Sequence, residues 1–520
     1  MRRCSRYVLA TGLAFVTIVA GTRADHNADF HLRMSLVGTS PTQATHSDLA
    51  FWGDHAFVGY YTGATGFPPG SGSRGGVRIF DISNPESPIL IRDFSCDGTQ
   101  NDLIVWDRNG NGVADLLLVA VDSTMANPNC GALRVAAGTP TGWEGVRIFE
   151  LSDDPANPFA TVTQVAAVYT DCGAHSITLW PGDVGNGRLL VYVSSYPFQA
   201  GPTCGDTEFL NTANPYDSDP GMPASPLHGV IQVLEVPLSN PGGATEIAQP
   251  AIAYHGDPDG RNEWCERGLC AGVEPAAVGC SSITVHVERR LAAAACGEQA
   301  QIWQIDETGI PNTAAPLQII DDDVSSGGTG QIPGAVDFFD SAAFTNSGDV
   351  VNFVDQSFGA GCPPATQYQA RPWNPAGGAH NTGRMFFLDA ATGELLNEFQ
   401  VGTVRPDAGA TAYCAAGRGA VARSMVRDVL VSAWYDGGVN LLDFTNPRHV
   451  REIAYYDLAS AGGQRSAYSY SGPSFTGGHP IYATDGVTNN GNAQGLVVFK
   501  ALVEDIMRFR IGQLNPQTID

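Results

Sequence analysis

Positive charge is scarce in this sequence. Its 28 lysine and arginine residues stand against 53 aspartate and glutamate residues, the formal net charge is −25 at pH 7, and Lys500 is the only lysine. A strongly acidic surface repels the phosphate backbone of nucleic acids. The composition therefore argues against a nucleic acid as partner.

Long apolar runs are scarce as well. One lies between Val8 and Gly21, after a basic segment that holds Arg2, Arg3 and Arg6. A basic segment, an apolar core and small residues before a cleavage point are typical of a secretory signal peptide, and the run is short for a membrane anchor. We expect residues 1–24 to be removed and the chain to be secreted or periplasmic. Because no second apolar run follows, we expect no membrane anchor.

The sequence also lacks the short motifs of familiar enzyme classes. It has no GxSxG nucleophile elbow and no HExxH spacing, and the glycine-rich stretch 70–75 lacks the strand-to-helix context of a phosphate loop. No reaction class is therefore indicated by a motif.

Eleven cysteines are present, and Cys4 lies in the predicted signal peptide. The other ten form an even number, which fits disulfide pairing in an exported chain better than a zinc site. Cys280 and Cys296 flank a predicted hairpin at equal distances from its tip. Because opposed residues of a hairpin lie within disulfide range, we predict a Cys280–Cys296 bridge.

A short apolar run closed by an acidic residue recurs along the chain at spacings of 54 to 85 residues. This is the spacing of propeller blades with loop insertions, so the sequence predicts an all-β, seven-bladed β-propeller that forms a single domain over residues 25–520. The copies are Val77–Asp81, Val146–Glu150, Ile231–Glu235, Ile302–Asp306, Met385–Asp389 and Val439–Asp443, with a last copy, Leu496–Lys500, that ends in a base.

A second repeat predicts the innermost strand of each blade. Its copies are Asp48–Trp52, Asp102–Trp106, Ser176–Trp180, Ser282–His286, Ser341–Thr345, Ser424–Asp428 and a segment near Ser471–Thr476. The last unit lacks a clear fourth strand, whereas the N-terminal segment offers a spare one at Leu32–Val37. We expect this strand to complete the last blade and close the ring, which leaves no open edge between the first and last blades.

The segment Gly76–Pro88 resembles the repeat unit of the LVIVD-repeat family of secreted bacterial β-propellers, and Gly145–Pro158 and Gly438–Pro447 are further copies. The serine or asparagine followed by proline at the end of the unit stops the strand and forms a turn. The resemblance implies a propeller, and it implies no defined chemistry and no catalytic residues.

The predicted connections between strands are unequal. Those between the first and second and between the third and fourth strands of a blade are short, and the remaining ones are long and rich in glycine, proline and asparagine. All long connections, and all ten cysteines, therefore map to one end of the predicted ring. We expect a disulfide-braced loop surface there, preorganised for binding a ligand.

Polar residues recur near the starts of the predicted inner strands, which converge on the mouth of the central channel. There they could bind a ligand or a metal or act as acid and base, or they could satisfy buried loop backbone. These candidate ligand-binding residues are His46, Asp48, Asp102, His175, Asp340 and Arg423.

The segment Asp107–Leu116 places oxygen-bearing side chains at alternate positions around a glycine turn. Asp107, Asn109, Asn111 and Asp115 suit a Ca²⁺ ion, and the segment resembles the calcium loop of integrin-type FG-GAP propeller repeats. An EF-hand is not indicated, because its glutamate position is Leu118 here. The alternative is a plain turn that binds nothing. Because the segment belongs to the short-turn end, calcium there would be structural.

We interpret the chain as a binding or scaffold module whose loop-rich end takes a protein, glycan or small-molecule ligand. An enzyme is the less favoured alternative: an extracellular hydrolase, lyase or metal-dependent oxidase with its site at the channel mouth.

Overall fold

A computed structural model describes residues 29–40, 44–61, 75–98, 100–133, 143–195, 229–253, 279–297, 299–321, 330–331, 336, 339–356, 383–401, 415–424, 426–435, 437–458, 463–474, 479–485, 495–503 and 511–520. These residues form β-strands and two three-residue 3-10 helices, Val184–Asn186 and Pro241–Gly243. No helix among them is long and apolar enough to cross a membrane. The predicted signal peptide, residues 1–24, lies outside the described part.

The strands form successive antiparallel meanders. The first contains β3 (Thr45–Trp52), β4 (His55–Tyr61), β5 (Gly75–Asp81) and β6 (Ile89–Ser95), and the second β7 (Gln100–Trp106), β8 (Leu116–Ala126), β9 (Trp143–Leu151) and β10 (Val162–Tyr169). The next contain β11 (Ser176–Trp180), β12 (Arg188–Ser194), β13 (Gln232–Pro237) and β14 (Thr245–Ala248), then β15 (Ser282–His286), β16 (Leu291–Cys296), β17 (Gln299–Gln304) and β18 (Gln318–Asp321), with β19 (Gly330–Gln331) beside β18. A further meander contains β20 (Phe339–Phe344), β21 (Val350–Asp355), β22 (Met385–Asp389) and β23 (Leu395–Phe399).

The strands from β24 to β30 belong to one nine-stranded sheet. It contains β24 (Arg418–Val421), β25 (Val429–Ala433), β26 (Val439–Asp443) and β27 (Arg451–Asp457), and also β28 (Gln464–Ser469), β29 (His479–Asp485) and β30 (Leu496–Ala501). A short parallel pairing of β24 with β28 joins the two groups. Two N-terminal strands, β1 (Phe30–Leu32) and β2 (Met34–Ser40), pair with β27 and β30 at the outer edges.

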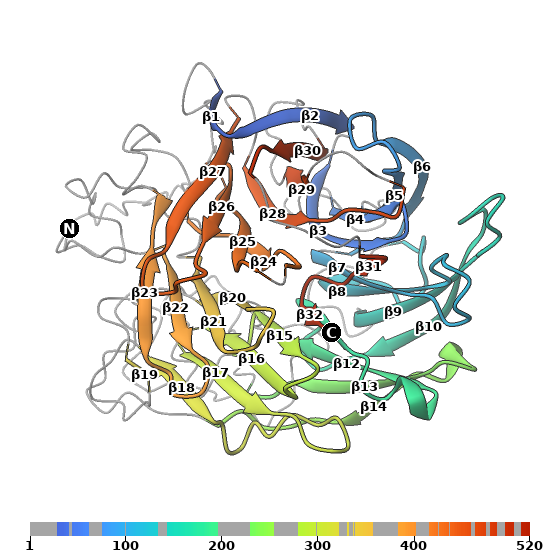
Figure 1. Ribbon diagram of the computed structural model, residues 1–520. Coiled ribbons are helices and arrows are strands. Elements are labelled where there is room, and N and C mark those ends of the chain that lie inside the picture. The colour runs from blue at the N-terminus through green and yellow to red at the C-terminus, as the bar shows by residue number, and fades with distance from the viewer. Residues whose placement is uncertain are drawn as a thin grey trace, which may run out of the picture.

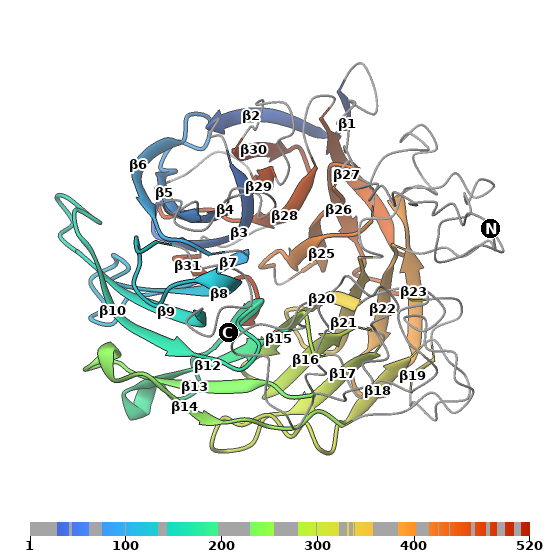
Figure 2. The same cartoon turned by 180° about the vertical axis from the view of Figure 1, so that it is seen from behind.

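The first strands of the meanders form a closed circle of contacts. Each of β3, β7, β11, β15, β20, β24 and β28 contacts the next, and β28 contacts β3 again. Figures 1 and 2 show the meanders arranged around a centre in which the C-terminus lies. The fold is therefore all-β and β-propeller-like.

Both faces of each inner sheet are buried, because every sheet packs between two neighbours. Along β3, Leu49 and Phe51 point to one side and pack against Tyr470 and the last strands, whereas Ala50 points to the other side and packs against Leu103 of β7. This is the two-residue alternation of a strand. The Phe51 and Tyr470 rings stack with their centroids 4.6 Å apart.

Ring closure by the N-terminal segment is confirmed. β2 pairs antiparallel with β30, with Met34 opposite Ala501 and Leu36 opposite Phe499. The predicted strand Leu32–Val37 is divided between β1 and β2, because the chain turns at Arg33, which has a positive φ of 50°. The last meander thus receives its outer strand from the other end of the chain.

All the predicted copies of the short apolar run, including the last one that ends in Lys500, are third strands of meanders, as β5, β9, β13, β17, β22, β26 and β30. The inner strands were predicted correctly up to β20, but the last two predictions were wrong. The described residues of Ser424–Asp428 form no strand, and the Ser424 hydroxyl accepts hydrogen bonds from the backbone N–H groups of Val426 and Arg427. The true inner strand, β24, precedes it, and β28 similarly ends before Ser471.

The two ends of the ring differ, and we name them by their connections. The loop end is where long connections leave the strands, as after Tyr61, which lies opposite Thr45 at the start of β3. The turn end carries short connections such as Gly53–Asp54. The predicted Cys280–Cys296 disulfide is present, and a Cys96–Cys130 disulfide accompanies it, both at the loop end. Much of the sequence of the predicted long connections lies outside the described residues. These parts include residues 62–74, 196–228, 254–278, 357–382 and 402–414.

The C-terminal segment adds an element that the sequence did not predict. Residues 511–520 cross the turn end of the ring as β31 (Gln513–Leu514) and β32 (Thr518–Ile519). β31 pairs antiparallel with β3, and β32 pairs parallel with β15.

Candidate functional site

Charged residues reach the central channel from bulges in the inner strands. The pairing of β3 with β4 shifts register between His46 and Leu49, and the pairing of β7 with β8 shifts between Gln100 and Leu103. A bulge leaves backbone groups without ladder partners. Asp48 and Asp102 lie in these two bulges, and the Oδ1 atom of each accepts a hydrogen bond from the next backbone N–H at 2.8 Å. The aspartates therefore complete the backbone hydrogen bonding that the bulges interrupt.

Two further inner strands carry a bulge at the same end. The shift in β20 lies at Asp340, and that in β28 spans Arg465 and Ser466. Asp340 is 3% exposed and accepts a hydrogen bond from the Ser281 hydroxyl of the neighbouring sheet at 2.7 Å. Each bulge thus places a charged side chain at the loop end of the channel.

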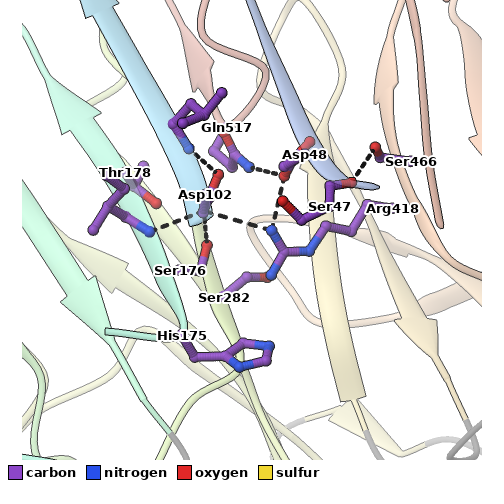
Figure 3. A network of polar contacts seen from close by, with 12 residues as sticks. Ser47, Asp48, Asp102, His175, Ser176, Thr178, Ser282, Arg418, Ser466 and Gln517 are labelled. Carbon is purple, nitrogen blue, oxygen red and sulfur yellow. Dashed lines mark hydrogen bonds and ion pairs between the residues drawn. The ribbon is translucent and has the colours of Figure 1, made fainter. Parts of the chain in front are cut away.

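Arg418 lies between the two aspartates from the first sheets (Figure 3). Its Nη1 atom is 2.8 Å from Asp48 Oδ2 and 3.5 Å from Asp102 Oδ2. Burial alone would lower the pKa of Arg418, but Asp102 and Asp48 raise it well above its usual value. Arg418 therefore remains charged and neutralises part of a buried acidic pair.

Asp102 is the second carboxylate of that pair. Burial, and then the charge of Asp48, raise the pKa of Asp102 to about 6, although Arg418 opposes them. Its Oδ2 atom accepts hydrogen bonds from the Ser176 hydroxyl at 2.6 Å and from the Ile177 N–H at 3.0 Å. Asp102 consequently links the second sheet to the third.

Asp48 has two additional partners from distant parts of the chain. The Tyr468 hydroxyl donates to Oδ1 at 2.6 Å, and the Gln517 amide donates to Oδ2 at 3.0 Å. Every carboxylate oxygen of Asp48 and Asp102 therefore has a protein donor.

His175 lies just before β11 and faces the same region. Its Nδ1 atom is 2.9 Å from Asp122 Oδ2. Burial raises the pKa of Asp122 to about 7, and burial together with the charge of Arg418 lowers the pKa of His175 well below 6.5. Both shifts favour the neutral forms, so a neutral imidazole is oriented by its carboxyl partner.

A cavity of about 20 Å³ lies between these groups. This volume holds roughly one water molecule. The lining residues are Ser47, His175, Asp340, Gln356, Arg418, Tyr435 and Arg465.

The structure brings together four of the predicted channel-mouth residues, Asp48, Asp102, His175 and Asp340, and separates the other two. His46 is buried against the neighbouring strands of the first sheet. Its Nε2 atom is 2.8 Å from Nη1 of Arg78 on β5, and its ring lies near Tyr60 of β4. It precedes the bulge, so its side chain takes the opposite direction from that of Asp48. Arg423 follows β24 at the turn end, where it donates to the Thr518 carbonyl at 2.6 Å.

Four residues of this site were not predicted from the sequence: Arg418, Asp122, Arg465 and Gln517. Arg418 and Arg465 begin the two inner strands that were misplaced, so a correct register would have found them. Asp122 and Gln517 carry no repeat signal, because one lies inside a long strand and the other in the C-terminal segment.

The predicted calcium loop connects β7 to β8 at the turn end. Asp107 accepts hydrogen bonds from the N–H groups of Gly110 and Gly112, each at 2.7 Å. The amides of Asn109 and Asn111 converge on the Asp153 carboxylate, with Asn111 Nδ2 at 2.9 Å from Oδ2. The oxygens of Asp107 are thus occupied by backbone N–H groups, and both asparagine amides donate to Asp153.

Asp115, the fourth predicted ligand, is held by Arg108. Its Oδ1 atom accepts from the Arg108 N–H at 2.8 Å, and its Oδ2 atom lies 3.0 Å from Nε. Asp115 is therefore turned toward Arg108, whereas Asp153 lies beside Asn109 and Asn111. Among the described residues, this loop included, no group of three or more His, Cys, Asp or Glu side chains is placed to hold a metal ion.

Comparison with known proteins gives neither a family nor a curated relative. No protein-family model matches the chain, and no curated protein matches it. Among solved structures it is similar to Sqt1 of Chaetomium thermophilum, which was crystallised with the N-terminus of ribosomal protein L10, at 11% identity and a TM-score of 0.44 over 89% of this chain and 90% of that one. It is also similar to a putative 6-phosphogluconolactonase of Bacteroides uniformis, at 9% identity and a TM-score of 0.46 over 84% and 89%. Because both likenesses are weak, the fold class is taken from the strand pairing within this chain and not from these structures.

Proposed function

We propose that this chain is an exported seven-bladed β-propeller that acts as a binding or scaffold module through its loop end. The nine-stranded sheet divides naturally into two blades, β24–β27 and β28–β30 with β2, because only two residue pairs join β24 to β28. With the other meanders this division makes seven blades. The likeness of Gly76–Pro88 to the LVIVD repeat remains part of this proposal.

The observation that carries the binding proposal is the state of the channel. Arg418 is paired with Asp48 and Asp102, the oxygens of these two carboxylates accept protein hydrogen bonds, and the space beside them measures about 20 Å³. A buried charge cluster that is satisfied internally stabilises the ring, and a space of one water molecule does not admit an organic substrate. In the described part of the chain, the channel is therefore better suited to hold the blades together than to perform a reaction.

The long connections supply the surface for a ligand. They enter and leave the strands at the loop end, where the Cys96–Cys130 and Cys280–Cys296 disulfides lie. Loops on a rigid scaffold are the usual carriers of recognition, and bracing reduces the entropy that binding must remove. Disulfides also persist in oxidising compartments, which agrees with export after cleavage of residues 1–24.

The enzyme alternative rests on His175 and Asp122. A carboxyl group at 2.9 Å from Nδ1 orients the imidazole as a general base requires. An extracellular hydrolase, lyase or metal-dependent oxidase would use this pair at the loop end of the channel.

Metal analysis and loop replacement together test the proposal. We expect purified protein to contain no stoichiometric iron, copper or manganese, and replacement of residues 196–228 by a short Gly-Ser turn to abolish binding on glycan and extracellular-protein arrays without lowering Tm. Glu86→Ala and Arg448→Ala, which alter exposed turn-end residues, are the controls. One equivalent of a redox metal that is lost in His175→Ala, but retained when the exposed His449 is replaced by alanine, would favour the enzyme instead.

A further inference from the structure

The C-terminal segment, Ile511–Asp520, is bound to the ring as a ligand would be bound. It crosses the turn end of the channel and contacts β3, β7, β11 and β15, and also Arg423 beyond β24. Figure 1 shows β31 and β32 beside the C-terminus at the centre of the ring. This site lies at the turn end, and it does not depend on the function proposed for the loop end.

The first half of the segment is anchored on the first two blades. The Gly53 N–H donates to the Gly512 carbonyl at 2.8 Å, and β31 adds antiparallel to the end of β3. Leu514 is 5% exposed and packs in the cluster that contains Phe51. The Asn515 side chain then pairs with both backbone groups of Val105, accepting at 2.9 Å and donating at 3.0 Å.

A turn redirects the segment toward the opposite inner strands. The Thr518 N–H donates to the Asn515 carbonyl at 2.9 Å, with Pro516 at the position of a β-turn that proline favours. The Gln517 carbonyl accepts from the Val285 N–H at 2.8 Å, and the Thr518 hydroxyl donates to the Leu179 carbonyl at 2.7 Å. Ile519 accepts from Val287 at 2.7 Å and is 7% exposed.

Two charged groups of the ring complete the site. Gln517 reaches into the channel and donates to Asp48 at 3.0 Å, which connects the segment to the Arg418 network. Arg423 donates to the Thr518 carbonyl at 2.6 Å and lies 3.8 Å from the Asp520 carboxylate.

These contacts match a known mode of peptide recognition. Backbone groups of the receptor strands pair with an added extended segment, and a few buried side chains give selectivity. We propose that the turn end of the channel is a peptide-binding site, which the C-terminal segment of the same chain occupies. Its ligands are extended peptides with a leucine, an Asn-Pro turn and a Thr-Ile pair in the spacing of Leu514–Ile519.

The experiment separates the segment from the ring after folding. A protease site is inserted between Val503 and Ile511, the folded protein is cut, and the released peptide is removed by dilution and gel filtration. Rebinding of a fluorescein-labelled peptide with the sequence of residues 511–520 is followed by anisotropy. We expect saturable one-to-one binding that raises the Tm of the cut ring, because a ligand of the native state stabilises it by mass action.

Two peptide variants test the recognition. Asn515→Ala removes two hydrogen bonds and leaves the Val105 backbone groups unpaired, so it should bind at least about tenfold more weakly. Gly512→Ala is the matched control, because a Cβ atom at Gly512 would meet no atom within 4 Å and binding should be unchanged.

Several outcomes would overturn the proposal. A cut ring that keeps its circular dichroism spectrum but does not bind the peptide would show that the contacts depend on the covalent link. Equal affinity of the native and Asn515→Ala peptides would show that the site has no selectivity. A ring that unfolds when the segment leaves, and that added peptide does not restore, would make the segment an inseparable part of the core. Restoration by the peptide would support the proposal.

Discussion

At the scale of single residues, the central question is how three charges remain buried together. Asp48 and Asp102 are each 1% exposed, and Arg418 supplies one positive charge between them. Taking charges out of water is expensive, and removal of one partner leaves the others uncompensated. Burial, and then the uncompensated charge of Asp48, are the reasons that the pKa of Asp102 moves upward.

This shift predicts an unusual dependence of stability on pH. Because the pKa of Asp102 rises from 3.8 to about 6 on folding, the folded state retains a proton that the unfolded state has lost. The stabilisation is fully present below about pH 4 and disappears as the pH rises toward 6. Relative to Asp102→Asn, the wild-type protein should lose up to about 3 kcal/mol of unfolding free energy over this interval, as measured by urea denaturation. Glu86→Gln, at an exposed turn, is the control, and parallel curves for wild type and Asp102→Asn would contradict the prediction.

The sequence could predict only part of this site. The recurrence of aspartate at the start of inner strands placed Asp48, Asp102 and Asp340 together, and this grouping agrees with the structure. It could not reveal the bulge that turns His46 away from the channel, because both faces of β3 are buried and a one-residue shift leaves no visible change in its apolar pattern. Arg423 was placed at the wrong end of the channel because the sixth inner strand was predicted after it, whereas β24 precedes it.

At the scale of elements, the acidic residue that closes the repeated run has a local function. Asp81, Asp306, Asp389 and Asp443 each accept a hydrogen bond from the backbone N–H two residues later, at 2.8 to 3.1 Å. This Asx turn ends the strand and directs the chain into the next one.

Glutamate is longer and fills the same position differently. Glu150 pairs with Arg108 at 2.8 Å, and Glu235 pairs with Arg188 at 2.5 Å, both within their own sheets. The repeated run could be predicted from the sequence because it combines the apolar pattern of a buried strand with a signal for the turn that follows. The inner strands β24 and β28 have weaker patterns, so serine-containing turns beyond them were mistaken for the strands.

The Asp107–Asp115 loop provides the prediction at this scale. If Asp107, Asn109, Asn111 and Asp153 hold Ca²⁺, chelation should lower Tm by several degrees, because an ion bound only to the native state stabilises it. Asp107→Ala should remove the difference between the chelated and calcium-loaded samples in differential scanning calorimetry. Asp349→Ala, at an exposed turn-end position, should leave the difference intact. Identical melting curves with and without chelator would indicate a turn held by its hydrogen bonds alone.

At the scale of the whole molecule, the ring depends on its two terminal segments. β2 supplies the outer strand beside β30, and residues 511–520 bridge the inner strands at the turn end. Met34, at the start of β2, is 1% exposed and packs in a cluster with Phe499 and Ala501.

Weakening the N-terminal strand should therefore destabilise the entire ring. We expect Met34→Ala to lower the unfolding free energy by about 2–4 kcal/mol, as buried methionine truncations do. Hydrogen exchange should become faster in β3 and β30 together. Leu36→Ala lies in the same strand at a side chain that is 37% exposed, and it should have a small effect. Faster exchange confined to β2, with unchanged Tm, would mean that the ring closes without this strand.

The pairing of β2 with β30 also constrains the order of events during biosynthesis. Met34 finds its partner only when Ala501 has been made, which at ordinary elongation rates takes on the order of a minute. Until β30 has been made, the backbone groups of β2 that pair with it have no hydrogen-bonding partners. Contacts this distant in sequence also form slowly. The nascent chain must therefore pass through open, strand-edged intermediates, and protection from aggregation during that interval becomes a requirement of the architecture.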